Sequence, residues 1–125
     1  MARPFREPTF LPLTLATAGA AADDVHTTAR RADAAAADCW TALLAGCDTP
    51  GKQQLPHRLT DLSNATTAYT RGACDHGKIH RAQARIVEAA ADRDGADFAE
   101  AFISYDQAVA TALARANTRL GTPTW

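Results

Sequence analysis

The chain has 125 residues and a formal net charge of −1, from 13 basic and 14 acidic side chains. This length fits one domain and excludes two independent cores, and the balanced charge excludes a global attraction to nucleic acid or anionic membranes. Thirty residues are alanine, while Leu, Ile, Val and Phe together supply only 20. We therefore expect a helical domain over residues 10–120, between an extended arm at 1–9 and a tail at 121–125, that pairs with a second copy to bury enough apolar surface.

The first predicted element is one long helix over about residues 10–46. Apolar residues recur there at alternating spacings of three and four, at Leu15, Ala18, Ala22, Val25, Ala29, Ala32, Ala36, Cys39 and Leu43. This seam predicts coiled-coil-like packing, and its alanines allow a neighbouring backbone to come close. Thr9 is the expected N-cap, and Gly46 is the expected C-terminal stop.

The N-terminal stretch imitates a secretory signal peptide, because Arg3 and Arg6 precede an apolar run over residues 10–22. Glu7 and three threonines dilute that pattern, and cleavage there would cut into the predicted first helix. The run is also too short to span a bilayer. We therefore expect a cytoplasmic protein, with secretion as the minority interpretation. The three cysteines form no CxxC motif, so we expect free thiols.

A loop over residues 47–56, with Pro50-Gly51 as its turn, is expected to lead into a second helix over about 57–92. Gly72 and Gly77 interrupt this second helix, which indicates either a local bend or a close backbone approach. The third helix is expected over about 96–120, after a turn at Asp94-Gly95. Its seam supplies the bulky side chains that the first helix lacks, at Phe98, Phe102, Tyr105, Val109, Ala112 and Ala116. The predicted fold is therefore all-α, an antiparallel up-down-up three-helix bundle with two long helices and a shorter third.

A mid-bundle ligand pocket is one functional hypothesis. His76 and Gln83 occupy seam positions of the second helix, and a simple hairpin register brings His26 to the same height. The hypothetical pocket consists of His26, His76, His80, Gln83 and Tyr105. His76 and His80, at i and i+4, are weak candidates for binding a divalent metal. No acidic residue shares their face, and Cys74 is expected about 200° around the helix from His76. Structural histidines are the more ordinary meaning of this pattern, and no cofactor is expected.

A basic stripe is the second candidate site, formed by Arg71, Lys78, Arg81 and Arg85. Such a stripe could contact phosphates or nucleic acid. A solvated outer face is the commoner meaning of a charge run, and no aromatic residue interleaves these cations to stack on bases. Nucleic acid is therefore not the expected partner.

An apolar stripe off the seam is the third candidate site. Trp40, Leu44 and Cys47 recur at helical spacing on the first helix, and Ile103 lies off the seam of the third. Such a stripe either packs under the predicted loop at 47–56 or forms an interaction surface with a second copy, predicted at Trp40, Leu44 and Ile103.

The sequence contains no Gly-rich phosphate loop, GxSxG or HExxH motif, and we predict no catalytic residues. The leading expectation is a non-enzymatic interaction or regulatory module that binds a protein partner or a second copy of itself. The alternatives are a ligand- or metal-binding bundle and a protein that contacts phosphates through the basic stripe.

Overall fold

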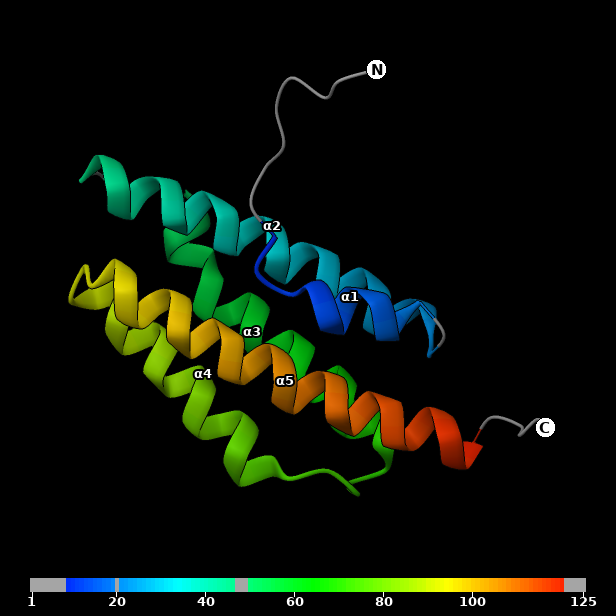
Figure 1. Ribbon diagram of the computed structural model, residues 1–125. Helices are drawn as coiled ribbons and strands as arrows, with labels where there is room; N and C mark the ends of the chain where they lie inside the picture. The colour runs from blue at the N-terminus through cyan, green and yellow to red at the C-terminus, as the bar shows by residue number, and fades with distance from the viewer. Residues whose placement is uncertain (1–8, 20, 47–49, 121–125) are drawn as a thin grey trace, which may run out of the picture.

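The computed structural model describes residues 9–19, 21–46 and 50–120, which form five helices (Figure 1). They are α1 (Pro12–Ala18), α2 (Asp23–Ala45), α3 (Pro50–Thr70), α4 (His76–Ala91) and α5 (Gly95–Leu120). Helix α2 packs mainly on α3, α4 packs mainly on α5, and α1 lies across both α2 and α5. The predicted all-α class is confirmed, but the predicted three-helix count is wrong. Apart from Thr9, the predicted arm and tail lie outside the described residues.

The predicted first helix is two helices, because the chain turns back between Gly19 and Asp23. Ala22 has extended backbone angles (φ −148°, ψ 153°), and α2 then begins with two acidic residues that suit a helix N-terminus. The predicted cap at Thr9 is also wrong, since Leu11 is the N-cap of α1. The predicted seam nevertheless stays buried on both sides of the break, at Ala18, Val25, Ala29, Ala32, Ala36 and Cys39.

Two carboxylates from other helices hold α1 in place. Asp33 of α2 accepts hydrogen bonds from the backbone N–H groups of residues 10 and 11, at 2.7 and 3.0 Å. Asp106 of α5, which is buried, accepts from the N–H groups of residues 13 and 14, at 3.1 and 2.8 Å. Because Leu11 gives α1 no side-chain cap, Asp106 performs that function from α5.

The predicted loop over residues 47–56 is wrong from Pro50 onward, where α3 begins; residues 47–49 lie outside the described chain. Pro56 lies inside the helix, where a proline costs about 3 kcal/mol relative to alanine. Leu55 and Leu59 on the same helix are fully buried. Burial of these leucines, each contributing roughly 1.5–3 kcal/mol, is large enough to offset the proline penalty.

The predicted second helix is also two helices. Arg71 and Gly72 have left-handed backbone angles (φ 56° and 79°), and the Gly72 N–H bonds the carbonyl of Thr67 at 3.0 Å, which ends α3. Helix α4 begins after Asp75, whose side chain accepts from the backbone N–H of residue 78 at 3.0 Å. Gly72 therefore marks a break, whereas Gly77 lies within the first turn of α4.

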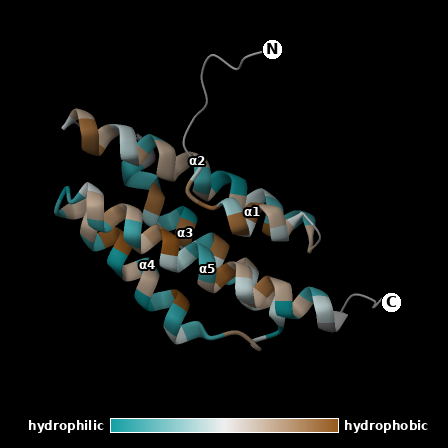
Figure 2. Cartoon of the chain, in the orientation of Figure 1, coloured by the Kyte–Doolittle hydropathy of each residue, from teal (hydrophilic) through white to brown (hydrophobic). Residues whose placement is uncertain are grey.

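The core is built around α5, whose predicted seam from Phe98 to Ala116 is buried throughout. Leu113, which the sequence pattern left off that seam, is buried as well. Figure 2 shows hydrophobic residues on the sides of α3, α4 and α5 that face one another. In the part of the chain that the structure describes, no helix is both long and apolar enough to cross a membrane.

Candidate functional site

An open groove of about 530 Å³ lies between α3 and α4. Helix α4 packs more extensively on α5 than on α3, which leaves this side of the α3–α4 pair less closely packed. Helix α3 lines the groove with Thr60, Ser63 and Asn64, and α4 lines it with His80, Gln83, Ala84, Val87, Glu88 and Ala91. The groove therefore combines an apolar wall with several polar side chains.

A chain of hydrogen bonds connects the groove to the core. The Ser63 hydroxyl, which is buried, lies 2.8 Å from Oε1 of Gln83 and 2.8 Å from the hydroxyl of Tyr105. Tyr105 also lies within donating distance of the Leu59 carbonyl, at 3.1 Å, and Nε2 of Gln83 donates to Thr60 Oγ1 at 3.0 Å. Polar groups of α3, α4 and α5 thus meet at the floor of the groove.

The orientation of the Gln83 amide decides whether every contact in this chain of hydrogen bonds receives a proton. When the Gln83 carbonyl faces Ser63, the Ser63 and Tyr105 hydroxyl groups supply two protons for three contacts, so one contact has no hydrogen bond. When the amide is rotated by half a turn, its NH₂ donates to Ser63, Ser63 donates to Tyr105, and Tyr105 donates to the Leu59 carbonyl. In both orientations the two ends of the amide contact the hydroxyl groups of Ser63 and Thr60.

Tyr105 anchors this chain in its neutral form. Burial raises the pKa of Tyr105 well above its ordinary value, and the hydrogen bond from Ser63 lowers that pKa only in part. The phenol therefore stays protonated at neutral pH and acts as a hydrogen-bonding group. Tyr105 lies behind Ser63 and does not itself line the groove.

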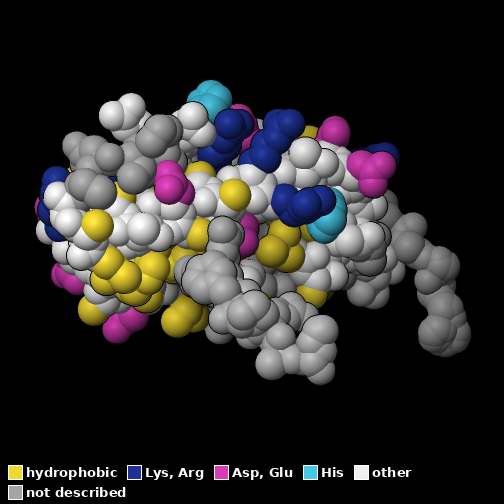
Figure 3. All heavy atoms as spheres, turned by 90° about the horizontal axis from the view of Figure 1, so that it is seen from above, with side chains coloured by type: hydrophobic (Ala, Val, Ile, Leu, Met, Phe, Trp, Pro, Cys, Tyr) yellow, Lys and Arg dark blue, Asp and Glu magenta, His cyan; other side chains and the backbone are white. Residues whose placement is uncertain are grey.

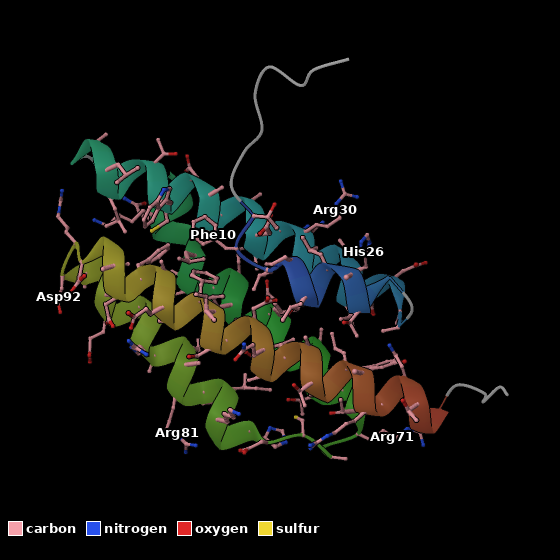
Figure 4. All side chains as sticks on the ribbon, in the orientation of Figure 1. Phe10, His26, Arg30, Arg71, Arg81 and Asp92 are labelled. Atoms are coloured by element: carbon pink, nitrogen blue, oxygen red, sulfur yellow. The ribbon has the colours of Figure 1, made fainter. Side chains whose placement is uncertain are left out.

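The structure brings together only part of the predicted histidine pocket. Gln83 and Tyr105 meet through Ser63, and His80 lines the groove. The His76 ring centre lies 6.4 Å from that of His80, beside the turn between α3 and α4. His26 lies on α2, on the side of the bundle away from α4 (Figure 4).

His26 is separated from the groove because the predicted hairpin register assumed a continuous helix over residues 57–92. In the structure α3 is the main partner of α2, and α4 turns to pack mainly on α5. The described ranges contain no group of three or more His, Cys, Asp or Glu side chains that could hold a metal ion.

Four polar groove residues, Thr60, Ser63, Asn64 and Glu88, are missing from the sequence-based candidates. A signal for Ser63 was available, because it follows Leu59 by four residues and so occupies a buried helical position. A small polar residue at such a position requires a hydrogen-bond partner.

The predicted interaction surface is partly exposed. Trp40 is half-buried and stacks on Phe98 with ring centres 6.0 Å apart, whereas Leu44 and Ile103 are 70% and 59% exposed. Leu13, 48% exposed, lines a second hollow of about 350 Å³ together with Ile103. Figure 3 shows hydrophobic side chains gathered toward the end of the bundle where α2 ends and α5 begins. Cys47 lies outside the described residues.

The predicted basic stripe is divided by the break between α3 and α4. Arg71 lies in the turn, and Figure 4 shows it far along the molecule from Arg81. Lys78, Arg81 and Arg85 are exposed on α4. Arg85 forms ion pairs with two carboxylates of α5, Asp97 and Glu100. These pairs favour an outer electrostatic contact between α4 and α5 over a continuous phosphate-binding stripe.

No protein-family model, curated protein or solved structure matches this chain. A bundle fold alone does not define a function, because one fold can host many functions. The geometry of the groove and of the exposed apolar residues is therefore the basis for a functional proposal.

Proposed function

We propose that the chain is a non-enzymatic helical bundle that binds a small organic molecule in the groove between α3 and α4. The observation that carries this proposal is the buried Ser63–Tyr105 contact, which opens through Gln83 into a hollow of about 530 Å³. Ligand sites in proteins commonly combine an apolar lining with a few convergent polar groups.

The groove lining indicates the chemistry of the ligand. Ala84 and Val87 offer an apolar wall, while Asn64 and Glu88 have side chains with no hydrogen-bond partner among the described residues. Glu88 disfavours an anion, so we propose a neutral or cationic ligand with an apolar body and a hydrogen-bonding end. The Ser63 hydroxyl is committed to its partners, which suits an anchor better than a nucleophile.

A thermal-shift screen with small amines, amides and matched carboxylates tests this proposal. At 100 times its dissociation constant, a ligand should stabilise the protein by about 2.7 kcal/mol. Ala84→Phe fills the groove and should abolish the shift, whereas the control Ala114→Phe, at an exposed position of α5, should retain it. Shifts that persist in Ala84→Phe, or that occur with carboxylates only, would contradict the proposal.

Self-association is the second candidate function. The described residues expose three large hydrophobic side chains, Leu13, Leu44 and Ile103, and two of them line one hollow. We propose a second copy of this chain as the occupant, because an alanine-rich chain of this size has few large side chains to bury on its own.

Light scattering over a range of protein concentrations tests self-association. The expected result is a dimer that Ile103→Glu converts to a monomer, since the glutamate would bury a charge in the interface. Thr27→Glu, at an exposed position of α2, is the charge-matched control and should remain dimeric. A wild-type monomer at high concentration would exclude this candidate.

A further inference from the structure

Cys74 and His76 lie side by side at the turn between α3 and α4. Sγ of Cys74 is 3.8 Å from Nε2 of His76, within reach of a hydrogen bond to sulfur. The sequence-based expectation that these side chains diverge by about 200° is wrong, because Cys74 precedes α4 and does not belong to a helix. The break at Gly72 thus creates a thiol–imidazole pair.

The hydrogen bonds of Thr67 determine which nitrogen of His76 carries the proton. The Thr67 hydroxyl donates its single proton to the carbonyl of Ser63 at 2.9 Å. Its oxygen can then only accept from Nδ1 of His76, which lies 3.4 Å away. Neutral His76 therefore has its proton on Nδ1 and its Nε2 lone pair toward the Cys74 thiol, the tautomer that can act as a base for that thiol.

The thiol opens into a hollow of about 210 Å³ that carries positive charge. Lys78 of α4 and Arg115 of α5 line it with Cys74, and both cations are exposed. The carboxylate of Asp75, which accepts the backbone N–H of residue 78, also lines it, so the two cations and one carboxylate leave a net positive charge. The remaining lining residues are small, namely Ala73, Ala108, Thr111 and Ala112. Two cations beside a thiol favour an anionic reaction partner.

We propose that Cys74 is a thiol–disulfide exchange site for a small anionic disulfide of the glutathione disulfide type. Sγ of Cys74 attacks one sulfur of the disulfide while its proton passes to Nε2 of His76. A new S–S bond to Cys74 forms, the original S–S bond breaks, and the leaving thiolate takes the proton back from His76. One disulfide replaces another, so no further oxidant is needed. This site is separate from the α3–α4 ligand groove.

The other two cysteines define the background for a test. Cys39 is fully buried, and burial raises the pKa of its thiol, so its reaction requires unfolding. Cys47 lies outside the described residues and is replaced by serine in every variant. Reaction at Cys39 then serves as an internal measure of unfolding, and reaction at Cys74 in the folded protein is the quantity of interest.

The experiment compares the rates at which glutathione disulfide and the neutral bis(2-hydroxyethyl) disulfide modify the folded protein, with the modified residue mapped by peptide mass spectrometry. Both reagents should modify Cys74. In the double variant Lys78→Gln/Arg115→Gln, the reaction with glutathione disulfide should be about tenfold slower, while the rate with the neutral reagent should change by less than about twofold. His76→Gln should slow the reaction of Cys74 with both reagents, and the distant control Arg30→Gln should slow neither reaction.

Two results would overturn the proposal. The first is modification that maps to Cys39 and not to Cys74 in the wild-type fold. The second is a double variant whose rates with the anionic and neutral reagents fall equally or not at all. If His76→Gln unfolds, Cys39 will react in that variant, and the ratio of the two rates in the exposed Lys78/Arg115 variant then decides the outcome.

Discussion

The hydroxyl groups of Ser63 and Tyr105, 42 positions apart in the chain, lie 2.8 Å from each other beneath the α3–α4 groove. Both residues are buried, and each also contacts a further hydrogen-bonding group, Gln83 for Ser63 and the Leu59 carbonyl for Tyr105. This contact ties the floor of the groove to the aromatic core of α5. Its removal should therefore affect both stability and ligand binding.

Tyr105→Phe removes the hydroxyl group that contacts Ser63 and the Leu59 carbonyl, and leaves both groups without this hydrogen-bond partner. We expect a loss of about 1 kcal/mol in the free energy of unfolding, measured by urea denaturation. Tyr69→Phe is the matched control at a half-buried tyrosine that donates to Asn117, and we expect it to leave ligand shifts in the groove unchanged. Unchanged stability and unchanged ligand shifts in Tyr105→Phe would show that the Tyr105 hydrogen bonds contribute neither to stability nor to ligand binding.

Burial of Tyr105 should also lower the free energy of unfolding at high pH. Because burial raises the pKa of Tyr105, the unfolded chain ionises above the ordinary value of 10.0 while the folded chain does not. The contribution of Tyr105 to the free energy of unfolding is therefore complete below about pH 10 and falls by about 1.4 kcal/mol per pH unit above it.

The alkaline slope is measured from denaturation curves between about pH 9 and pH 12. The wild type should lose stability more steeply than Tyr105→Phe above the ordinary pKa of tyrosine. Cys39, whose pKa burial also raises from 9.0, contributes in the same direction to both proteins and so cancels in the comparison. Parallel curves would indicate that Tyr105 ionises normally in the fold.

Asp106→Ala should release α1 from the bundle. The substitution removes a buried carboxylate that accepts two backbone N–H groups of α1, and we expect a loss of about 2 kcal/mol in the free energy of unfolding. Hydrogen exchange should show reduced protection of the amides of residues 13–18. Asp75→Ala, which removes an exposed cap of α4, is the control and should leave α1 protected. Full protection of α1 in Asp106→Ala would refute the capping role.

Thr66→Val should stabilise the protein by about 1 kcal/mol. Thr66 is fully buried, and its hydroxyl has no hydrogen-bond partner in the described residues, so valine of similar shape removes only an unsatisfied group. Thr14→Val is the opposite control, because the Thr14 hydroxyl donates to the Asp106 carbonyl at 3.2 Å, and it should be destabilising. Destabilisation by Thr66→Val would show that its hydroxyl has a structural partner after all.

The sequence predicted buried positions more accurately than helix boundaries. Spacing of apolar residues determines which side chains are buried, so the seams from Ala18 to Cys39 and from Phe98 to Ala116 are correct apart from Ala22, which is half-buried. The start of α1 depends on Asp33 and Asp106, which lie on other helices. No local pattern near residue 12 could indicate a cap from residue 106.

The candidate site was predictable only where it depended on a single helix. Gln83 and Tyr105 stand out as polar groups at seam positions, and the structure joins them through Ser63. The position of His26 depended on which helix pairs with α2, and the Cys74–His76 contact depended on a turn between two helices. The first is a tertiary relationship and the second depends on a local turn, and helical periodicity encodes neither.

Two-dimensional NMR of the ¹⁵N-labelled protein with a library of small amines and amides tests ligand binding in the groove most directly. We expect ligands to shift the side-chain NH₂ signals of Asn64 and Gln83, both of which line the groove. The NH₂ signals of Gln107 and Asn117, which do not line it, should stay unchanged, and Ala84→Phe should abolish the shifts. Shifts confined to Gln107 and its neighbours in the Leu13–Ile103 hollow, or no shifts at all, would contradict a ligand site between α3 and α4.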